Sequence, residues 1–203
     1  MRLNLNHPAS KLTIAATGAS GAVFAREMLR TLEADARVEE VNFIASDGGL
    51  RVFAEELEIT GRNELVPQLL GAASLKIRQQ SNQDIGANVA SGSYLAEAMI
   101  VIPCSMGTLA RIANGMAIHL IERAADVCLK EQRPLVLCVR ETPLNKVHIR
   151  NMQLAADAGA TIFPIAPAFY NKPVDSAEMA RQFICRVLSH VGLEQKDTFR
   201  WKG

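Results

Sequence analysis

The sequence has little of what marks membrane-bound, secreted or nucleic-acid-binding proteins. No apolar run approaches the roughly 20 residues that span a bilayer, and the polar start, Met1 to Pro8, does not have the order of a signal peptide. The 22 Lys and Arg residues nearly balance 21 Asp and Glu, so the formal net charge of +1 would not attract a polyanion. We therefore expect a soluble, cytoplasmic protein with neither membranes nor nucleic acid among its partners.

Cysteine and histidine are also scarce, with four residues of each. The cysteines contain no C-x-x-C pair, and three of them lie in apolar stretches, as is typical of reduced, buried thiols in the cytosol. The histidines have no metal-ligand spacing, so we predict no metal site. The expected free thiols are Cys104, Cys128, Cys138 and Cys185.

What the sequence does have is a regular alternation of short apolar runs with segments of helical periodicity. Its 203 residues, 49% of them hydrophobic, suffice for one well-buried core. We expect a single domain over residues 1–203, with a core at about 11–190 and a C-terminal tail at 191–203 that docks on the site or on a neighbouring subunit. Strands alternating with helices predict an α/β fold, a Rossmann-like (flavodoxin-like) three-layer sandwich with a mostly parallel sheet.

The alternation also predicts where the elements lie. Strands are expected at 11–16, 41–45, 96–103, 135–139 and 161–163. Helices are expected at 22–32, at 50–56 with a cap at Ser46 or Asp47, from about 105, and at 117–130, 144–158 and 176–188. The weaker periodicity of residues 57–83 predicts a helical or irregular segment with a short strand at 75–78.

Three of the expected strands end in small or charged residues that fit a ligand. The loop Gly18–Gly21 can present backbone N–H groups and the Ser20 hydroxyl to an anion at a helix N-terminus, where glycine permits a tight turn and close approach. Ser105–Thr108 places two hydroxyls and a glycine at a second strand end, and Arg140 and Glu141 follow a third. Since open α/β sheets bind ligands at the carboxyl ends of their strands, we expect these groups at one sheet edge.

Each motif also has a purely structural interpretation. Gly-rich turns are common after first strands, Ser105 could be an ordinary helix cap, and a lone cation such as Lys130 is usually solvated. A Thr-Gly-Ala loop also begins short-chain dehydrogenases, but neither Tyr94 nor Tyr170 has the Lys four residues on that their chemistry needs. The sequence therefore does not favour a nicotinamide enzyme.

Taken together, six segments of the chain closely resemble the UbiX flavin prenyltransferases. The resemblance covers nearly the whole chain, from about Leu12 to Trp201, although Ala45–Gly49 departs from the family's usual Ser-Lys-Ala-Ala. The segments are Thr17–Ala22, Ala90–Ser93, Pro103–Leu109, Glu122–Glu131, Arg140–Leu144 and Pro167–Tyr170.

The resemblance implies an enzyme that joins the dimethylallyl group of dimethylallyl monophosphate to N5 and C6 of reduced FMN. Its product, prenylated FMN, would serve a separate UbiD-type decarboxylase. In ubiquinone-producing bacteria that decarboxylase acts on a polyprenyl hydroxybenzoate, and elsewhere on aromatic acids. The resemblance further implies a homo-oligomer, a dodecamer with the flavin at subunit contacts.

Carried over residue by residue, the resemblance implies several groups of site residues. The implied FMN contacts are Gly18, Ala19, Ser20, Ser46, Ser105, Met106, Gly107, Thr108 and Arg140. The implied contacts of the dimethylallyl phosphate are Lys130, Arg140, Glu141, Tyr170 and Arg186. The implied catalytic residues are Ser20, Glu56 and Glu141, and residues expected near the site are Ser91, Gly92 and Trp201.

Three other functions compete with this one. An FMN-dependent cysteine decarboxylase of the related fold is the nearest, but the chain has no Pro-Ala-Ser-Ala-Asn-Thr-like segment. A non-catalytic FMN carrier would have no use for a second phosphate site, yet Lys130, Arg140 and Arg186 are all present. A direct aromatic-acid decarboxylase is disfavoured, because no residues supply that chemistry without a modified cofactor.

Overall fold

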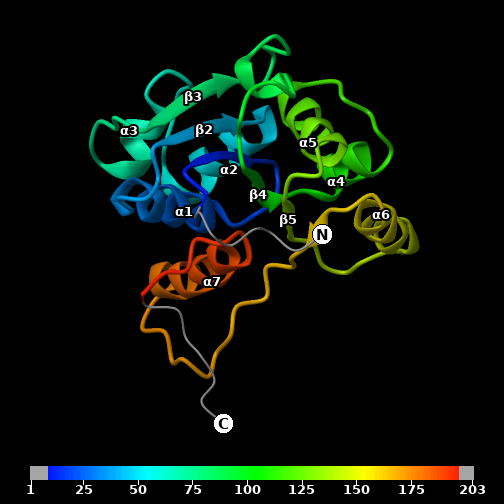
Figure 1. The fold of residues 1–203 in the computed structure, drawn as a ribbon. Helices are drawn as coiled ribbons and strands as arrows, with labels where there is room; N and C mark the ends of the chain where they lie inside the picture. Colours follow the sequence, from blue (N-terminus) through cyan, green and yellow to red (C-terminus); the bar gives the residue numbers. More distant parts are fainter. Residues whose placement is uncertain (1–8, 197–203) are drawn as a thin grey trace.

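The computed structural model describes residues 9–196, which form one six-stranded sheet with helices on both faces (Figure 1). The strands are β1 (Lys11–Ala16), β2 (Glu40–Ala45), β3 (Ile77–Ser81), β4 (Ala98–Cys104), β5 (Leu135–Val139) and β6 (Thr161–Ile162). The α-helices are α1 (Ala22–Ala34), α2 (Asp47–Leu57), α3 (Leu65–Leu70), α4 (Met106–Ala113), α5 (Leu120–Lys130), α6 (Lys146–Asp157) and α7 (Ser176–His190), and a short 3-10 helix is η1 (Asn88–Ala90). The predicted α/β class is confirmed.

The strands all run parallel, in the order β3-β2-β1-β4-β5-β6. A mostly parallel sheet was expected, and within residues 9–196 no strand of the sheet is antiparallel. The order is that of a Rossmann sheet and not the 2-1-3-4-5 order of flavodoxin. The direction of strand addition reverses between β1 and β4, so the crevice at their carboxyl ends is where such a fold binds ligands.

Alternate side chains of the strands build a core on each face of the sheet. Leu12 and Ile14 of β1 belong to the apolar cluster that includes α1 and α7, whereas Ala15 belongs to the cluster that includes α4 and α5. Figure 1 shows α7 beside α1, with α4, α5 and α6 gathered on the other side of the sheet. Because both faces are covered, every residue of β4 is buried, which explains why this strand is a continuous apolar run in the sequence.

The structure differs from the expected elements mainly between residues 57 and 83. This segment contains α3 and the edge strand β3, which runs beyond the strand expected at 75–78. Only Ile77 of β3 is buried, so the strand has no apolar pattern by which the sequence could locate it.

The start of α5 is set by a contact that is distant in sequence. Asn82 accepts hydrogen bonds from the backbone N–H groups of Leu120, through its carbonyl oxygen at 2.9 Å, and of Ile121, through its side chain at 3.1 Å. These bonds satisfy free donors of the first helical turn. The helix therefore begins at Leu120, whereas the periodicity predicts a start at residue 117.

The described residues contain buried thiols but neither a membrane-spanning helix nor a metal cluster. Among residues 9–196, no helix is long and apolar enough to cross a membrane, and no group of three His, Cys, Asp or Glu side chains could hold a metal ion. All four cysteines are free and buried, as predicted. Burial raises the pKa of Cys104 to about 12 and that of Cys138 well above its ordinary value, so neither thiol is a nucleophile at neutral pH.

Two glycines at the start of α2 allow this helix to pack directly on the end of β1. A Cβ on Gly48 would lie 3.0 Å from the Cα of Gly18, and a Cβ on Gly49 would lie 2.6 Å from the carbonyl oxygen of Ala16. The segment that departs from the Ser-Lys-Ala-Ala pattern therefore brings the backbone of α2 into contact with the loop after β1.

We expect Gly49→Ala to destabilise the fold by about 1–3 kcal/mol, because the added methyl group collides with backbone that cannot move aside. For a chain of this size, the melting temperature should fall by roughly 2–12 °C. Thermal unfolding of the variant checks this, with Gly86→Ala as the control. A Cβ at Gly86 meets only a side-chain oxygen of Asp84, at 3.4 Å. Equal melting temperatures for the two variants would contradict the packing argument.

Candidate functional site at the carboxyl edge of the sheet

Thr17 joins the ends of the two central strands. Its hydroxyl donates to the carbonyl oxygen of Pro103 at 2.9 Å and accepts from the backbone N–H of Ser105 at 2.7 Å. Its own N–H also donates to Pro103, at 3.1 Å, and its side chain is buried. The loop after β1 and the turn after β4 are thus fixed to each other at the point where the strand order reverses.

We expect Thr17→Val to cost about 1–3 kcal/mol of stability, because the isosteric side chain leaves the N–H of Ser105 without its acceptor. Denaturant titration measures this cost. Thr31→Val is the matched control, since the Thr31 hydroxyl bonds only the carbonyl of Glu27 one turn earlier in α1. A loss no larger than that of the control would mean that the junction is not a structural element of the site.

The N-terminus of α1 already holds a carboxylate. Glu56 of α2 accepts hydrogen bonds from the N–H of Gly21 at 3.0 and 3.1 Å and from the N–H of Ala22 at 2.7 Å. The adjacent Glu55 instead pairs with Arg51 on the solvent side of α2, at 2.7 Å. The structure therefore places Glu56, and not Glu55, next to the exposed Ser20.

Ser46 directly follows β2 at the same edge. Its hydroxyl accepts from the N–H of Gly49 at 3.0 Å, and its own N–H donates to the carbonyl of Ala16 at 3.0 Å. Ser46 is thus the cap of α2, one of the two caps that the sequence predicts. The cap also ties the end of β2 to the end of β1, so the ends of β2, β1 and β4 form one continuous edge.

The turn after β4 has free donors. The Ser105 hydroxyl caps α4 by accepting from the N–H of Thr108 at 3.3 Å. Within residues 9–196, the N–H groups of Met106 and Gly107 donate to no other group, and Gly107 is exposed. This turn, unlike the start of α1, can receive an anion at its first-turn N–H groups.

Arg140 and Glu141 lie beside this turn, as the sequence predicts. The backbone N–H of Arg140 donates to the carbonyl of Cys104 at 3.2 Å, which fixes the end of β5 against the end of β4. Both side chains are exposed, and a carboxylate oxygen of Glu141 accepts from the N–H of Thr142 at 3.0 Å. The charged pair therefore faces solvent at the edge that carries Ser20 and Ser105.

Lys130, Ser91 and Gly92 lie at the opposite, amino edge. Lys130 is the last residue of α5, and β5 begins five residues later. Between them, Arg133 donates to the carbonyl oxygen of Gly92 at 2.6 Å, and a Cβ on Gly92 would lie 2.7 Å from the Lys130 ammonium nitrogen. The seven residues of β4 separate the two edges by roughly 20 Å. One chain does not bring Lys130 to the carboxyl edge.

The other two residues expected at the donor phosphate are also apart from that edge. Arg186 is exposed on α7, one helical turn before His190, whose ring lies 3.1 Å from the hydroxyl of Thr161 at the start of β6. Tyr170 is 61% exposed in the segment between β6 and α7, which Figure 1 shows extending away from the sheet. Trp201 lies outside the described residues.

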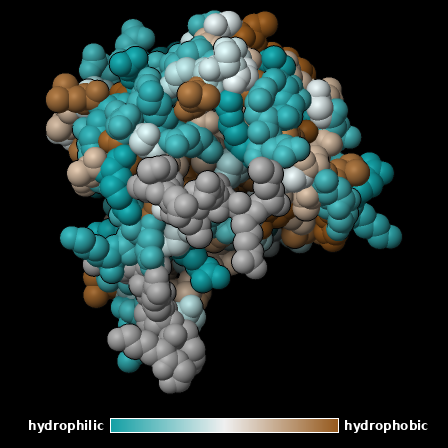
Figure 2. All heavy atoms as spheres, in the orientation of Figure 1, coloured by the Kyte–Doolittle hydropathy of each residue, from teal (hydrophilic) through white to brown (hydrophobic). Residues whose placement is uncertain are grey.

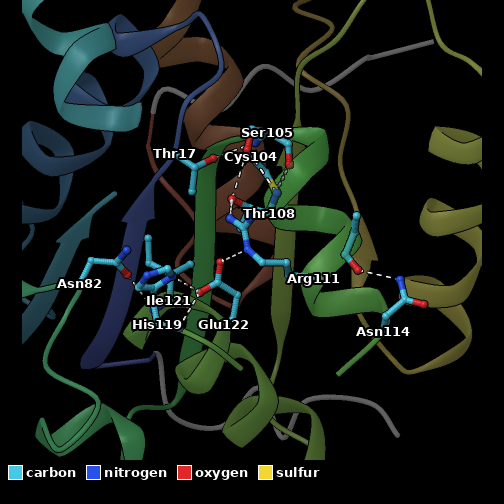
Figure 3. A network of polar contacts seen from close by, with 11 residues as sticks. Thr17, Asn82, Cys104, Ser105, Thr108, Arg111, Asn114, His119, Ile121 and Glu122 are labelled. Carbon is cyan, nitrogen blue, oxygen red and sulfur yellow. Dashed lines mark hydrogen bonds and ion pairs between the residues drawn. The ribbon is translucent and has the colours of Figure 1, made fainter. Parts of the chain in front are cut away.

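A polar network that the sequence does not reveal supports the turn after β4 (Figure 3). Arg111 donates to the hydroxyl of Thr108 at 3.2 Å and to a carboxylate oxygen of Glu122 at 2.6 Å. Glu122 also accepts from the N–H of His119 at 3.2 Å. Arg111 and Glu122 are on different helices, and their spacing of eleven residues fits no motif. The one indication in the sequence is Glu122 itself, a charged residue within an apolar stretch, since a buried carboxylate needs a partner.

These features define a class of protein. The sheet is parallel and doubly wound, and the loop after β1 meets the turn after β4 at the point where the strand order reverses. The turn after β4 offers free N–H groups there. This arrangement is that of a nucleotide-binding α/β protein. Its ligand would lie across the ends of β1 and β4.

Comparison with known proteins narrows the class to a family. The model of the Flavoprotein family matches residues 2–182. The flavin prenyltransferase UbiX of Pseudomonas aeruginosa is 39% identical over 197 residues, a match that covers 94% of this chain and 93% of the relative. The chain belongs to the UbiX flavin prenyltransferase family.

Two solved structures of similar proteins agree with this membership. That of AnUbiX in complex with FMN and dimethylallyl pyrophosphate superposes with a TM-score of 0.85 at 37% identity, covering 98% of this chain and 99% of the other. A dodecameric FMN-dependent UbiX-like decarboxylase from Escherichia coli O157:H7 gives 0.83 at 38% identity, covering 95% and 100%.

Proposed function

We propose that this protein transfers the dimethylallyl group of dimethylallyl monophosphate to reduced FMN, at N5 and C6, and that a UbiD-type decarboxylase uses the product. The likeness to AnUbiX bound to FMN and dimethylallyl pyrophosphate, over nearly the full length of both chains, carries the proposal. The free donors at the reversal point of the sheet support a phosphate-bearing ligand of this kind.

The flavin phosphate is placed at the turn after β4 in this proposal. The N-terminus of α1 is occupied by Glu56, whereas the N–H groups of Met106 and Gly107 are free within the described residues. An anion at the start of α4 would gain these donors and the favourable end of the helix dipole. The remaining FMN contacts would be Gly18, Ala19, Ser20, Ser46, Ser105, Thr108 and Arg140.

Bound FMN would supply the ring that accepts the prenyl group, and the protein would supply charge, orientation and proton transfer. Glu56 is fixed beside Ser20 by three hydrogen bonds, so that its carboxylate can take a proton near that hydroxyl. Glu141 is the second proton acceptor of the proposal, at the end of β5. Both carboxylates belong to the carboxyl edge.

The leaving phosphate needs positive charge, and of the cations expected at the donor phosphate, one chain places only Arg140 at that edge within residues 9–196. We place Lys130, Tyr170 and Arg186 at the donor phosphate through contacts between copies of the chain, with Ser91 and Gly92 beside Lys130. Cations and a hydroxyl donor there would stabilise the charge that develops as the carbon–oxygen bond breaks. A site between copies also removes water, which would otherwise capture the allyl fragment.

Exposed apolar side chains support a homo-oligomer. Helix α6 and the residue before its cap leave Leu144, Val147 and Ile149 about half exposed, and Met116 and Ile118 are similarly exposed after α4. Figure 2 shows hydrophobic atoms between polar ones on the α6 side of the molecule. Such patches on a chain of this size are typical of subunit contacts. We propose a dodecamer like that of the Escherichia coli structure.

The test is anaerobic incubation of the purified protein with reduced FMN and dimethylallyl monophosphate, followed by mass analysis of the released flavin. A gain of one five-carbon unit is the expected result, and the diphosphate in a parallel incubation establishes which donor is preferred. Tightly bound but unmodified FMN with both donors would contradict the proposal and favour the cysteine decarboxylase or the flavin carrier.

A further inference from the structure

Arg111 lies beside the turn that would hold the flavin phosphate. Its side chain extends from the sixth residue of α4 toward the helix start, where one terminal nitrogen donates to Thr108 at 3.2 Å. The other terminal nitrogen, Nη1, is 3.8 Å from the position that a Cβ on Gly107 would occupy. Because residue 107 is a glycine, no side chain at this position separates the Arg111 guanidinium from the free N–H groups of the turn.

The guanidinium retains unused donors. Of its five N–H groups, one donates from Nε to Glu122 and one from Nη2 to Thr108. Within residues 9–196 the others donate to no protein group, and the side chain is 35% exposed. These donors can therefore reach a ligand oxygen, and the planar fork suits two oxygens of one phosphate.

Arg111 also determines whether the Thr108 hydroxyl donates or accepts hydrogen bonds. A guanidinium only donates, so the Thr108 oxygen must accept from it, and the same oxygen accepts from the Ser105 hydroxyl at 3.1 Å. With both lone pairs used, the Thr108 proton is left to donate elsewhere. Figure 3 shows Arg111 between Thr108 and Glu122, with Ser105 on the far side of Thr108.

Glu122 holds the guanidinium in this orientation. Its side chain is only 3% exposed, and its two oxygens accept from Arg111 and from the N–H of His119. Since a buried carboxylate needs a partner, the ion pair restricts Arg111 to conformations that keep Nε on Glu122. The free edge of the guanidinium then points along α4 toward its first turn.

We propose that Arg111 binds the phosphate of the flavin at the start of α4, and that Glu122 is its positioning residue. The inference rests on the proposed function, because it takes FMN as the ligand. It adds a cation to a phosphate site that otherwise consists of backbone N–H groups, hydroxyls and Arg140.

The test compares dissociation constants of FMN and riboflavin, which differ only in the phosphate. Arg111→Met with Glu122→Gln is the main variant, because the Gln avoids an unpaired buried carboxylate and can still accept from His119. We expect FMN to bind roughly 10- to 100-fold more weakly, with riboflavin changed less than about twofold. The matched control, Arg51→Met with Glu55→Gln, removes an exposed ion pair of α2 and should change neither constant.

Several outcomes would overturn the inference. Unchanged FMN affinity in the main variant would show that Arg111 does not bind the phosphate. Equal weakening of FMN and riboflavin binding would show that the Arg111–Glu122 ion pair only supports the structure of the site. Arg111→Lys provides a second check, since a shorter cation that cannot serve Glu122 and the phosphate together should also lose FMN selectively. If the unaltered protein binds riboflavin and FMN equally, or neither, the proposed function fails as well.

Discussion

Mixed oligomers of the Lys130→Ala and Arg140→Ala variants are expected to regain prenyl transfer that neither variant has alone. Each single variant should lose about 100-fold or more in rate, because each removes a cation from the leaving phosphate. If the site takes Arg140 from one copy and Lys130 from another, random assembly leaves roughly a quarter of the sites intact. The measurement is prenylated flavin formed by oligomers purified through two different tags.

The reason for this expectation is the distance between the two edges of one chain. Arg140 is fixed to the end of β4 by its bond to Cys104, while Lys130 lies near Gly92, in the segment that precedes that strand. Two residues anchored at sheet edges roughly 20 Å apart do not meet at one phosphate. A second copy must then supply Lys130 if it acts at the site.

A matched pair of variants makes the test specific. Mixing Arg140→Ala with Ser20→Ala should restore nothing, because both residues lie at the carboxyl edge of the same chain, so that every site takes both from one chain and is defective. Recovery in this control, or none in the first mixture, would contradict a site shared between copies.

Glu56→Gln is expected to lower the rate of prenyl transfer by about 100- to 1,000-fold while FMN still binds. Glutamine keeps an oxygen that can accept from Gly21 and Ala22, so the helix start remains capped, but its amide can no longer take a proton. Single-turnover kinetics with saturating FMN would measure the loss, and flavin fluorescence would verify binding.

The neighbouring residue offers the control. Glu55→Gln removes an exposed carboxylate that is adjacent to Glu56 in sequence but pairs with Arg51 instead of the start of α1. Its rate should stay within about twofold of the unaltered protein. Equal losses in the two variants would mean that the position of the carboxylate over α1 has no catalytic importance.

Much of the fold could be predicted from the sequence because it depends on local patterns. The buried strands are continuous apolar runs, as for β4, and the helices have their own caps, as Ser46 and Ser105 provide. Edge strand β3 and the start of α5 could not be predicted in the same way. The first buries a single side chain, and the second depends on Asn82, which is remote in sequence.

The sequence by itself determined the parallel α/β sheet, the strand ends that carry Ser20, Ser105 and Arg140, and the resemblance to a flavin prenyltransferase. Only the tertiary structure decided how these groups are arranged. It placed Glu56 on the start of α1, joined Arg111 to Glu122 beneath the turn after β4, and set Lys130 at the opposite edge. The physical reason is that hydrophobic periodicity and helix caps act between residues close in sequence. Ion pairs and strand order instead depend on packing between residues that are far apart in sequence and have no fixed spacing.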